Sequence, residues 1–178
     1  GSYTFTTHGQ YEHDLLLSNC YDVGCRLSVA GARSGIAFGA SNKRYIIENC
    51  SFSGLMQVEN VDDLTVKDTV LTGVDASRHR FGVRGNVTLE RVTFAAAASV
   101  LFSRHNDVSG AITPDFGTIT IRDCVLPTDL RHHFHEADYY FDNCKGFEKF
   151  DFTSSGGDDP VAVWPRSITI KNCDMVLN

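Results

Sequence analysis

The residues of this chain best suited to chemistry are arginines and histidines that stand side by side at three places in the sequence. They occur as Arg78-His79-Arg80, Arg104-His105 and Arg131-His132-His133. An arginine guanidinium matches the geometry of a carboxylate or sulfate group, and histidine exchanges a proton near neutral pH. In a chain that is acidic overall, such a cationic strip favours binding of an acidic polysaccharide.

Lyase chemistry on such a polymer needs a base that removes the proton beside a uronic carboxylate and a cation that neutralises this carboxylate. We predict that His79 or His105 is the base. Arg80 or Arg104 is the predicted neutralising cation. The same residue types are also typical of solvated loops, and this alternative stays open because only geometry separates the two.

A second group of residues is predicted to bind the polymer. In the stretch 131–135 the side chains alternate, so that Arg131, His133 and His135 share the outward side of a strand. Tyr140 falls on an outward position, where an aromatic ring can stack on a sugar. The full predicted binding set is Arg78, Arg104, Arg131, His132, His133, His135 and Tyr140.

Paired carboxylates offer a different reaction, because glycosidases place two acids about 5–5.5 Å apart for retention or about 6.5–9.5 Å apart for inversion. The available pairs are Glu12 with Asp14, Asp62 with Asp63, Asp138 with Asp142, and Asp158 with Asp159. Acids this close in sequence are also common turn formers. No metal or other cofactor is expected, since the chain has no Cys-x-x-Cys pair.

Seven copies of one short stretch must position these residues. Each copy has an anchor position, and successive anchors lie 19 to 32 residues apart. The anchors are Cys20, Cys50, Thr69, Val92, Cys124, Cys144 and Cys173. Residues three and five positions before each anchor are apolar, whereas six of the seven residues two positions before it are charged. This alternation predicts one strand per copy, and the repeat length predicts stacked units.

A polar residue stands directly before every anchor. These residues are Asn19, Asn49, Asp68, Arg91, Asp123, Asn143 and Asn172. Asn and Asp tolerate left-handed backbone, so each strand is predicted to turn a corner at this position. Between the anchors we predict further strands at 26–29, 57–58, 100–102 and 149–152. Projecting loops are predicted at 30–43, 75–85, 103–117 and 154–166.

Three of the repeats carry a family resemblance. They read Tyr-Ile-Ile-Glu-Asn-Cys-Ser-Phe at 45–52, Ile-Thr-Ile-Arg-Asp-Cys-Val-Leu at 119–126 and Ile-Thr-Ile-Lys-Asn-Cys-Asp-Met at 168–175. These stretches resemble coils of right-handed parallel β-helices in the pectate-lyase-like superfamily. The resemblance implies an all-β fold, a single-stranded right-handed parallel β-helix of about seven coils.

The resemblance also implies a function, because this superfamily includes polysaccharide lyases, glycosidases and bacteriophage tailspikes. It points to binding, and with it depolymerisation, of a carbohydrate polymer, as in a phage tailspike or receptor-binding protein of the virion tail or the extracellular space. Tailspikes of this type are typically trimers, which implies a homotrimer for the full-length protein. Two alternatives remain, a stand-alone lyase or glycosidase and a structural stalk or adhesin without activity.

The resemblance assigns no catalytic residue. The calcium-binding aspartates of pectate lyases are missing from the chain, as are the Asn-Lys-Ser and Arg-His-Gly motifs of alginate- and chondroitin-cleaving relatives.

Length and composition set further limits. The 178 residues are expected to form one domain, 1–178, and Gly1-Ser2 resembles a tag remnant, so we expect a piece of a longer protein. With 16 basic against 22 acidic residues the net charge is −6, which gives no reason to expect nucleic acid as partner. No apolar run is long enough for membrane insertion.

The cysteines indicate a compartment. Five of the six occupy anchor positions, where stacked parallel strands hold the Cβ atoms further apart than a disulfide allows. We therefore expect a row of buried free thiols, with Cys25 outside it. Free thiols fit assembly in a reducing bacterial cytoplasm.

Overall fold

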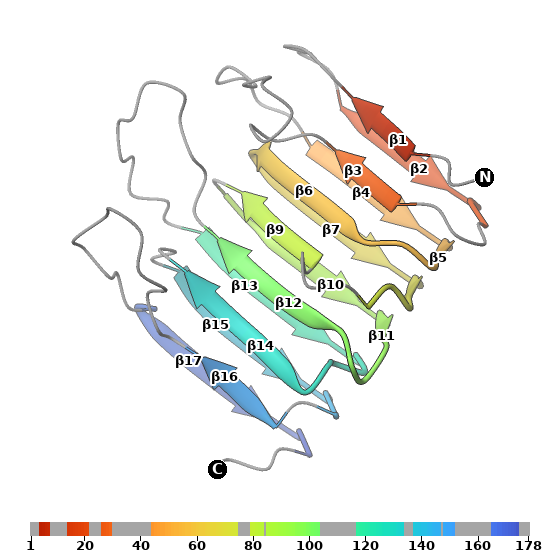
Figure 1. Ribbon diagram of the computed structural model, residues 1–178. Helices are drawn as coiled ribbons and strands as arrows, with labels where there is room; N and C mark the ends of the chain where they lie inside the picture. Colours follow the sequence, from red (N-terminus) through yellow and green to blue (C-terminus); the bar gives the residue numbers. More distant parts are fainter. Residues whose placement is uncertain are drawn as a thin grey trace.

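The computed structural model of the protein describes residues 4–7, 14–21, 26–29, 44–74, 79–83, 85–103, 117–133, 137–146, 148–151 and 165–174. In this part of the chain the strands β1 to β17 pair in parallel and form three sheets (Figure 1). The predicted all-β class with parallel strands is confirmed.

The first sheet, here called the repeat sheet, takes one strand from each of the seven repeated stretches. Its strands are β2 (Leu15–Ser18), β4 (Arg44–Glu48), β7 (Asp63–Lys67), β10 (Val87–Glu90), β13 (Gly117–Arg122), β15 (Ala137–Asp142) and β17 (Ser167–Lys171). They stack in sequence order, so that β2 and β17 lie at the two edges of the sheet.

The second sheet, here called the opposite sheet, is built from the segments between the repeats. Its strands, again in sequence order, are β1 (Thr4–Thr7), β3 (Arg26–Val29), β6 (Met56–Val61), β9 (His79–Val83), β12 (Ser99–Ser103), β14 (Asp129–His133) and β16 (Lys149–Asp151). The predicted loop at 75–85 is wrong in part, because β9 lies within it. The reason is visible in the sequence, since His79 and Phe81 alternate with polar or small residues and both are buried.

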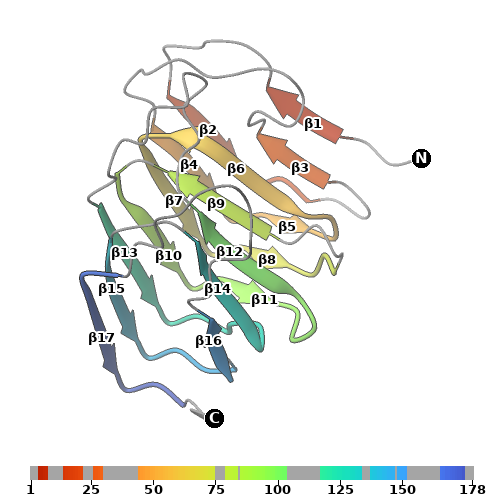
Figure 2. The same cartoon turned by 60° about the vertical axis from the view of Figure 1, so that its left-hand side comes forward.

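A short third sheet lies between these two along the chain. It contains β5 (Ser51–Phe52), β8 (Val70–Leu71) and β11 (Thr93–Phe94). In the three repeats that contribute to the short sheet, the chain therefore passes from the repeat sheet through a corner to the short sheet, then to the opposite sheet, and back to the next repeat strand. Figure 2 shows the resulting stack, which extends from the strands near the N-terminus to those near the C-terminus.

The core lies between the sheets and follows the two predicted apolar columns. The buried members of these columns are Tyr45, Ile47, Leu64, Val66, Val87, Leu89, Ile119, Ile121, Tyr139 and Phe141. Strand pairing places each of them directly over its equivalent in the next repeat, as Leu89 lies over Val66 and under Ile121. The prediction of inward apolar columns is confirmed for these strands.

Aromatic rings from all three sheets pack in the interior. The ring centroid of Phe102 lies 5.8 Å from that of Phe81 and 5.8 Å from that of Tyr139. Phe150 on β16 packs against Tyr139 at 5.1 Å and against Phe141 at 5.7 Å. These contacts join β9, β12, β15 and β16 into one continuous core.

The outward face of the repeat sheet carries charges of alternating sign. The row two positions before the anchors reads, from strand to paired strand, Glu48, Lys67, Glu90, Arg122, Asp142 and Lys171. Opposite charges on adjacent strands attract, and like charges would repel. The row therefore favours this register over a slipped one and satisfies its own charges.

All seven residues before the anchors have left-handed backbone. Their φ angles lie between 47° and 56°, as predicted for corners. The five anchor cysteines are free thiols, also as predicted, and burial raises the pKa of Cys50. Cys25 lies outside the described residues. Among those residues no helix has the length and apolar character needed to cross a membrane.

Candidate functional site

His79, a predicted catalytic base, lies in the interior. The side chain is fully buried and packs edge-on against Phe94, with 5.5 Å between the ring centroids. The Met56 backbone N–H donates to Nδ1 at 3.0 Å, and Nε2–H donates to the Gly73 carbonyl at 3.0 Å. Burial lowers the pKa of His79 from 6.5 to about 4. The structure thus places His79 in the interior, where both ring nitrogens are engaged in hydrogen bonds to the backbone, and its catalytic role stays a prediction.

Arg80 and Arg131 occupy one row of the opposite sheet, on either side of Leu101. Leu101, which lies between the two arginines in this row, is only 4% exposed. Arg131 donates from Nε to Oδ2 of Asp129 at 2.8 Å, and Ser99 Oγ donates to the same oxygen at 3.0 Å. Asp129, on the same strand, therefore balances the charge of Arg131.

The histidines of the predicted strip do not align with each other. Val100 pairs with both His79 and Leu130, whereas His132 pairs with the buried Phe102. His133 lies two residues beyond Arg131, in register with Ser103. Arg78, Arg104, His105 and His135 lie outside the described residues, so their predicted roles remain predictions.

The described members of the predicted carboxylate pairs are held by neighbours. Asp14 accepts hydrogen bonds from Arg44, whose side chain lowers the pKa of this carboxyl. Asp63 accepts from the backbone and side chain of Asn86, and Asp138 accepts from Arg166 Nη2 at 2.6 Å. Such contacts indicate structural roles. Glu12, Asp158 and Asp159 lie outside the described residues.

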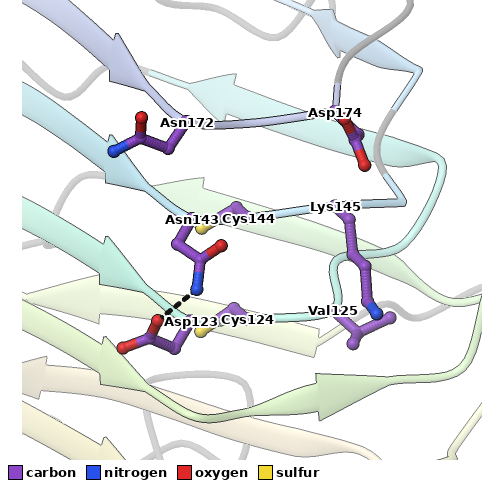
Figure 3. Close-up of a pocket in the computed structure, with 8 residues that line it drawn as sticks. All are labelled: Asp123, Cys124, Val125, Asn143, Cys144, Lys145, Asn172 and Asp174. Atoms are coloured by element: carbon purple, nitrogen blue, oxygen red, sulfur yellow. Dashed lines mark hydrogen bonds between the residues drawn. The ribbon is translucent and has the colours of Figure 1, made fainter.

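A groove of about 260 Å³ lies at the corner of the last three repeats, where the repeat sheet ends. We call it the corner groove, and its lining residues are Asp123, Cys124, Val125, Asn143, Cys144, Lys145, Asn172 and Asp174. Figure 3 shows Asp123, Asn143 and Asn172 along one side and Val125, Lys145 and Asp174 along the other. Each side thus receives one residue from each of three successive turns.

Backbone geometry creates the two walls of the corner groove. The left-handed residues Asp123, Asn143 and Asn172 turn the chain, and the next residue in each repeat is a cysteine. The backbone of the floor is satisfied by pairing between turns, since Lys145 N–H donates to the Cys124 carbonyl at 3.1 Å and Asp174 N–H donates to the Cys144 carbonyl at 3.0 Å. The side chains of the walls are therefore the groups that can contact a ligand.

Those side chains offer carboxylates, amides and one ammonium group. Asn143 Nδ2 donates to Asp123 Oδ1 at 2.6 Å, which orients both side chains. Asn172 Nδ2 donates to Asp142 Oδ1 at 3.0 Å. Among the described residues no group of three or more His, Cys, Asp or Glu side chains is arranged to hold a metal ion. The groove is suited to hydrogen bonding with polar groups such as hydroxyls.

Tyr140, a predicted binding residue, lies beside the corner groove on the outward face of β15. Its ring is half-buried between two cations, with Arg122 Cζ 5.3 Å and Lys171 Nζ 5.4 Å from the ring centroid. Its hydroxyl donates to Asp142 Oδ2 at 3.2 Å, and Asp142 in turn accepts from Asn172. This chain of contacts joins Tyr140 to the wall of the groove.

Sequence reasoning predicted the corners but missed the groove. The signal was present in the last two repeats, where polar residues stand on both sides of the anchor, as Asn143 and Lys145 do around Cys144. The sequence did not show that the side chains one position before and one position after an anchor line the same groove. They do so because the residue before the anchor has left-handed backbone.

Comparison of the chain with protein-family models, curated proteins and solved structures gives no match. The fold therefore defines the class of this protein: an all-β protein with parallel strands in three sheets.

Proposed function

We propose that the chain is a right-handed parallel β-helix of about seven coils that binds a carbohydrate polymer in the corner groove and on Tyr140. The observation that carries this proposal is the groove itself, in which three successive turns present polar side chains beside an aromatic ring. Sugar hydroxyls pair with amides and carboxylates, and the half-buried ring of Tyr140 between Arg122 and Lys171 adds an apolar edge for contact with the sugar.

The repeat spacing supports a polymer as the ligand. Adjacent strands lie about 4.8 Å apart, so equivalent groups recur at this interval along the wall formed by Asp123, Asn143 and Asn172. A chain of similar units would meet a similar group on each turn. A small ligand would use only one of these turns.

The charge of the groove favours a neutral glycan. Asp123 and Asp174 contribute two carboxylates and Lys145 one ammonium, so the lining residues sum to −1. Arg122, Lys171 and Asp142 around Tyr140 add one net positive charge, so the whole proposed site sums to zero and gives an acidic polymer no net attraction. This proposal differs from the acidic polysaccharide that the arginine and histidine pairs predicted, because His79 is buried and Arg131 is paired with Asp129.

The family resemblance supplies the biological setting of the proposal. We infer a role like that of a phage tailspike or receptor-binding protein, with a trimeric full-length protein that meets its glycan outside the cell. The experiment that tests binding also tests depolymerisation, because it measures the molar mass of the glycan.

The experiment measures the molar mass of neutral and acidic bacterial polysaccharides by light scattering on a sizing column, before and after incubation with the protein. We expect a neutral glycan to co-elute with the protein. A fall in glycan mass would add cleavage to binding. If no glycan co-elutes and none loses mass, the proposal is wrong.

Tyr140→Ala tests where the glycan binds. Loss of the contact with the Tyr140 ring, worth about 0.5–1.5 kcal/mol, should weaken binding about 3- to 10-fold. Tyr21→Ala is the matched control, because Tyr21 is an exposed tyrosine that also contacts a corner residue, Asn49, but lies outside the groove. Equal affinities of the two variants would contradict the proposed location.

A structural stalk is the second candidate, and the alternating charges on the repeat sheet favour it. A face that satisfies its own charges suits a rigid spacer with no ligand. If the protein is a stalk, Tyr140→Ala would change neither the co-elution nor the molar mass of any glycan. The joint substitution of Arg78, Arg104 and Arg131 would also have no effect.

A further inference from the structure

Two buried cysteines lie on adjacent turns beneath the corner groove. Val125 pairs with Lys145, and Cys124 and Cys144 directly precede these two residues, so they occupy equivalent places in successive repeats. Figure 3 shows their sulfur atoms one above the other. Both cysteines are 1% exposed free thiols, and both line the groove. They form a dithiol to which neither the fold nor the proposed glycan site assigns a role.

The stacking of the strands sets the distance between these two sulfur atoms. Adjacent strands lie about 4.8 Å apart, and equivalent side chains repeat at this interval. The sulfur atoms of a disulfide lie about 2.05 Å apart, so the interval is too long for that bond. Two thiolates that bind one cation from opposite sides, each through a bond of about 2.3 Å, lie about 4.6 Å apart. The interval between turns therefore matches a linear sulfur–metal–sulfur unit.

Backbone N–H groups donate to the sulfur atoms along this row. The Val92 N–H donates to Cys124 Sγ at 3.5 Å, and the Cys124 N–H donates to Cys144 Sγ. In the next turn the Cys144 N–H donates to Cys173 Sγ at 3.3 Å. Each anchor N–H thus serves the sulfur of the following repeat. Hydrogen bonds to sulfur support thiolate ligands in metal sites, because they stabilise the negative charge.

The thiols can lose their protons without leaving a backbone carbonyl unpaired. Each thiol donates to the carbonyl two residues before it, at 3.0 Å for Cys124 and 3.3 Å for Cys144. The same two carbonyls also accept backbone N–H groups of the preceding turn, from Arg91 and Asp123, each at 3.0 Å. Exchange of the thiol protons for a metal ion therefore keeps the backbone hydrogen bonds of both turns.

We propose that Cys124 and Cys144 bind one soft cation of the Cu⁺ class between their sulfur atoms. Thiolates favour Cu⁺ among the first-row metals, and two of them in line are enough for this ion. Each thiol releases one proton to solvent as its bond to the metal forms, and no electron is transferred. Zn²⁺ takes four ligands, and among the described residues no group of three or more suitable side chains is arranged to hold it. The site does not depend on glycan binding in the groove.

The first test titrates the reduced protein with Cu⁺ in the absence of oxygen, in competition with a chromophoric Cu⁺ chelator. The starting variant carries Cys25→Ser and Cys50→Val, which leaves Cys20 as the only thiol outside the row of the last three repeats. We expect this variant to take one Cu⁺ from the chelator. Addition of Cys144→Val should abolish the binding, and valine fits this position because Val92 is the anchor of another repeat. A starting variant that takes no Cu⁺ would overturn the proposal.

Cys173→Val in the same starting variant is the matched control. It should keep the ion, because Cys124 and Cys144 remain adjacent. X-ray absorption of the bound copper should show two sulfur neighbours at about 2.3 Å. Circular dichroism checks the fold, and Cys144→Thr replaces Cys144→Val if the latter does not fold, since Thr69 is also an anchor. Retention of Cu⁺ without Cys144, loss of Cu⁺ in the Cys173→Val control, or more than two sulfur neighbours would each contradict the proposed site.

Discussion

The buried side chain of His79 stabilises the fold through two hydrogen bonds to the backbone. His79 joins two backbone groups, the Met56 N–H and the Gly73 carbonyl, that would otherwise be unpaired in the core. Buried polar groups without partners cost about 1–3 kcal/mol each. Only the neutral ring can accept from Met56 while donating to Gly73, so the protonation state of His79 is coupled to folding.

This coupling predicts a loss of stability in mild acid. The pKa of His79 is about 4 in the folded chain and 6.5 without the fold, so the folded state binds fewer protons between these values. The stabilisation is fully present above pH 6.5 and is lost as the pH falls to 4. The free energy of unfolding should fall by on the order of 3 kcal/mol across this range, measured by urea denaturation.

His79→Leu is the comparison for this prediction. The variant should be less stable at pH 7, because it leaves Met56 N–H and the Gly73 carbonyl unpaired. Its stability should also depend less on pH between 6.5 and 4. Equal slopes for the variant and the unmodified chain would show that other groups cause the pH dependence.

At the level of elements, the repeat sheet is held in register by side chains on both of its faces. Apolar columns fill the inner face, and the row from Glu48 to Lys171 alternates in sign on the outer one. A slip by one residue would exchange the two faces, and a slip by two residues would move each charge away from its opposite neighbour. The two patterns together specify one pairing.

Lys67→Glu tests the charge row. Lys67 lies between Glu48 and Glu90, with Nζ 3.6 Å from Glu90 Oε2, so the substitution places three acids on adjacent strands. Because these side chains are partly exposed, solvent screens them, and the expected loss in free energy of unfolding is about 0.5–1 kcal/mol. High salt should reduce this loss.

The double variant Glu48→Lys with Lys67→Glu is the control, because Glu48 pairs on its other side with the uncharged Ser18. It restores one opposite pair and should recover part of the lost stability. A double variant that is less stable than Lys67→Glu alone would contradict the role of the charge row.

The same alternation explains which predictions from sequence succeed. Strands, inward columns and corners follow from period-two patterning and from the Asn and Asp residues, because both are local properties. The burial of His79 was not predicted, because the inward positions of its short strand are carried by His79 and Phe81, and a histidine gives no apolar signal. The corner groove depends on contacts between turns 20 and 29 residues apart, which the pattern within one repeat does not encode.

At the scale of the whole molecule, one aromatic core spans several turns. Phe102 contacts Phe81 and Tyr139, which belong to different sheets and different repeats. Neighbouring turns therefore share their stabilising contacts. Such sharing is expected to make the described strands unfold together.

Phe102→Ala tests this coupling. Removal of the buried ring should lower the free energy of unfolding by about 3–5 kcal/mol. We expect circular dichroism and tyrosine fluorescence to report one common transition in both proteins. Val70→Ala, at a side chain 40% exposed, should change stability by no more than about 0.5 kcal/mol. Separate transitions for the two probes would mean that the turns fold independently.

The unequal spacing of the repeats has a consequence for how such a chain can diversify. One residue, Asp62, separates β6 from β7, whereas residues 104–116 separate β12 from β13. The left-handed corners show no comparable variation, because each places its anchor residue over the anchor of the previous repeat. Most of the length variation therefore falls at the edge where the opposite sheet returns to the repeat sheet, and a smaller part falls before the opposite sheet, where residues 72–78 separate β8 from β9 but only residues 53–55 separate β5 from β6. Along that edge, insertions can accumulate and surface character can diverge while the scaffold beneath stays the same.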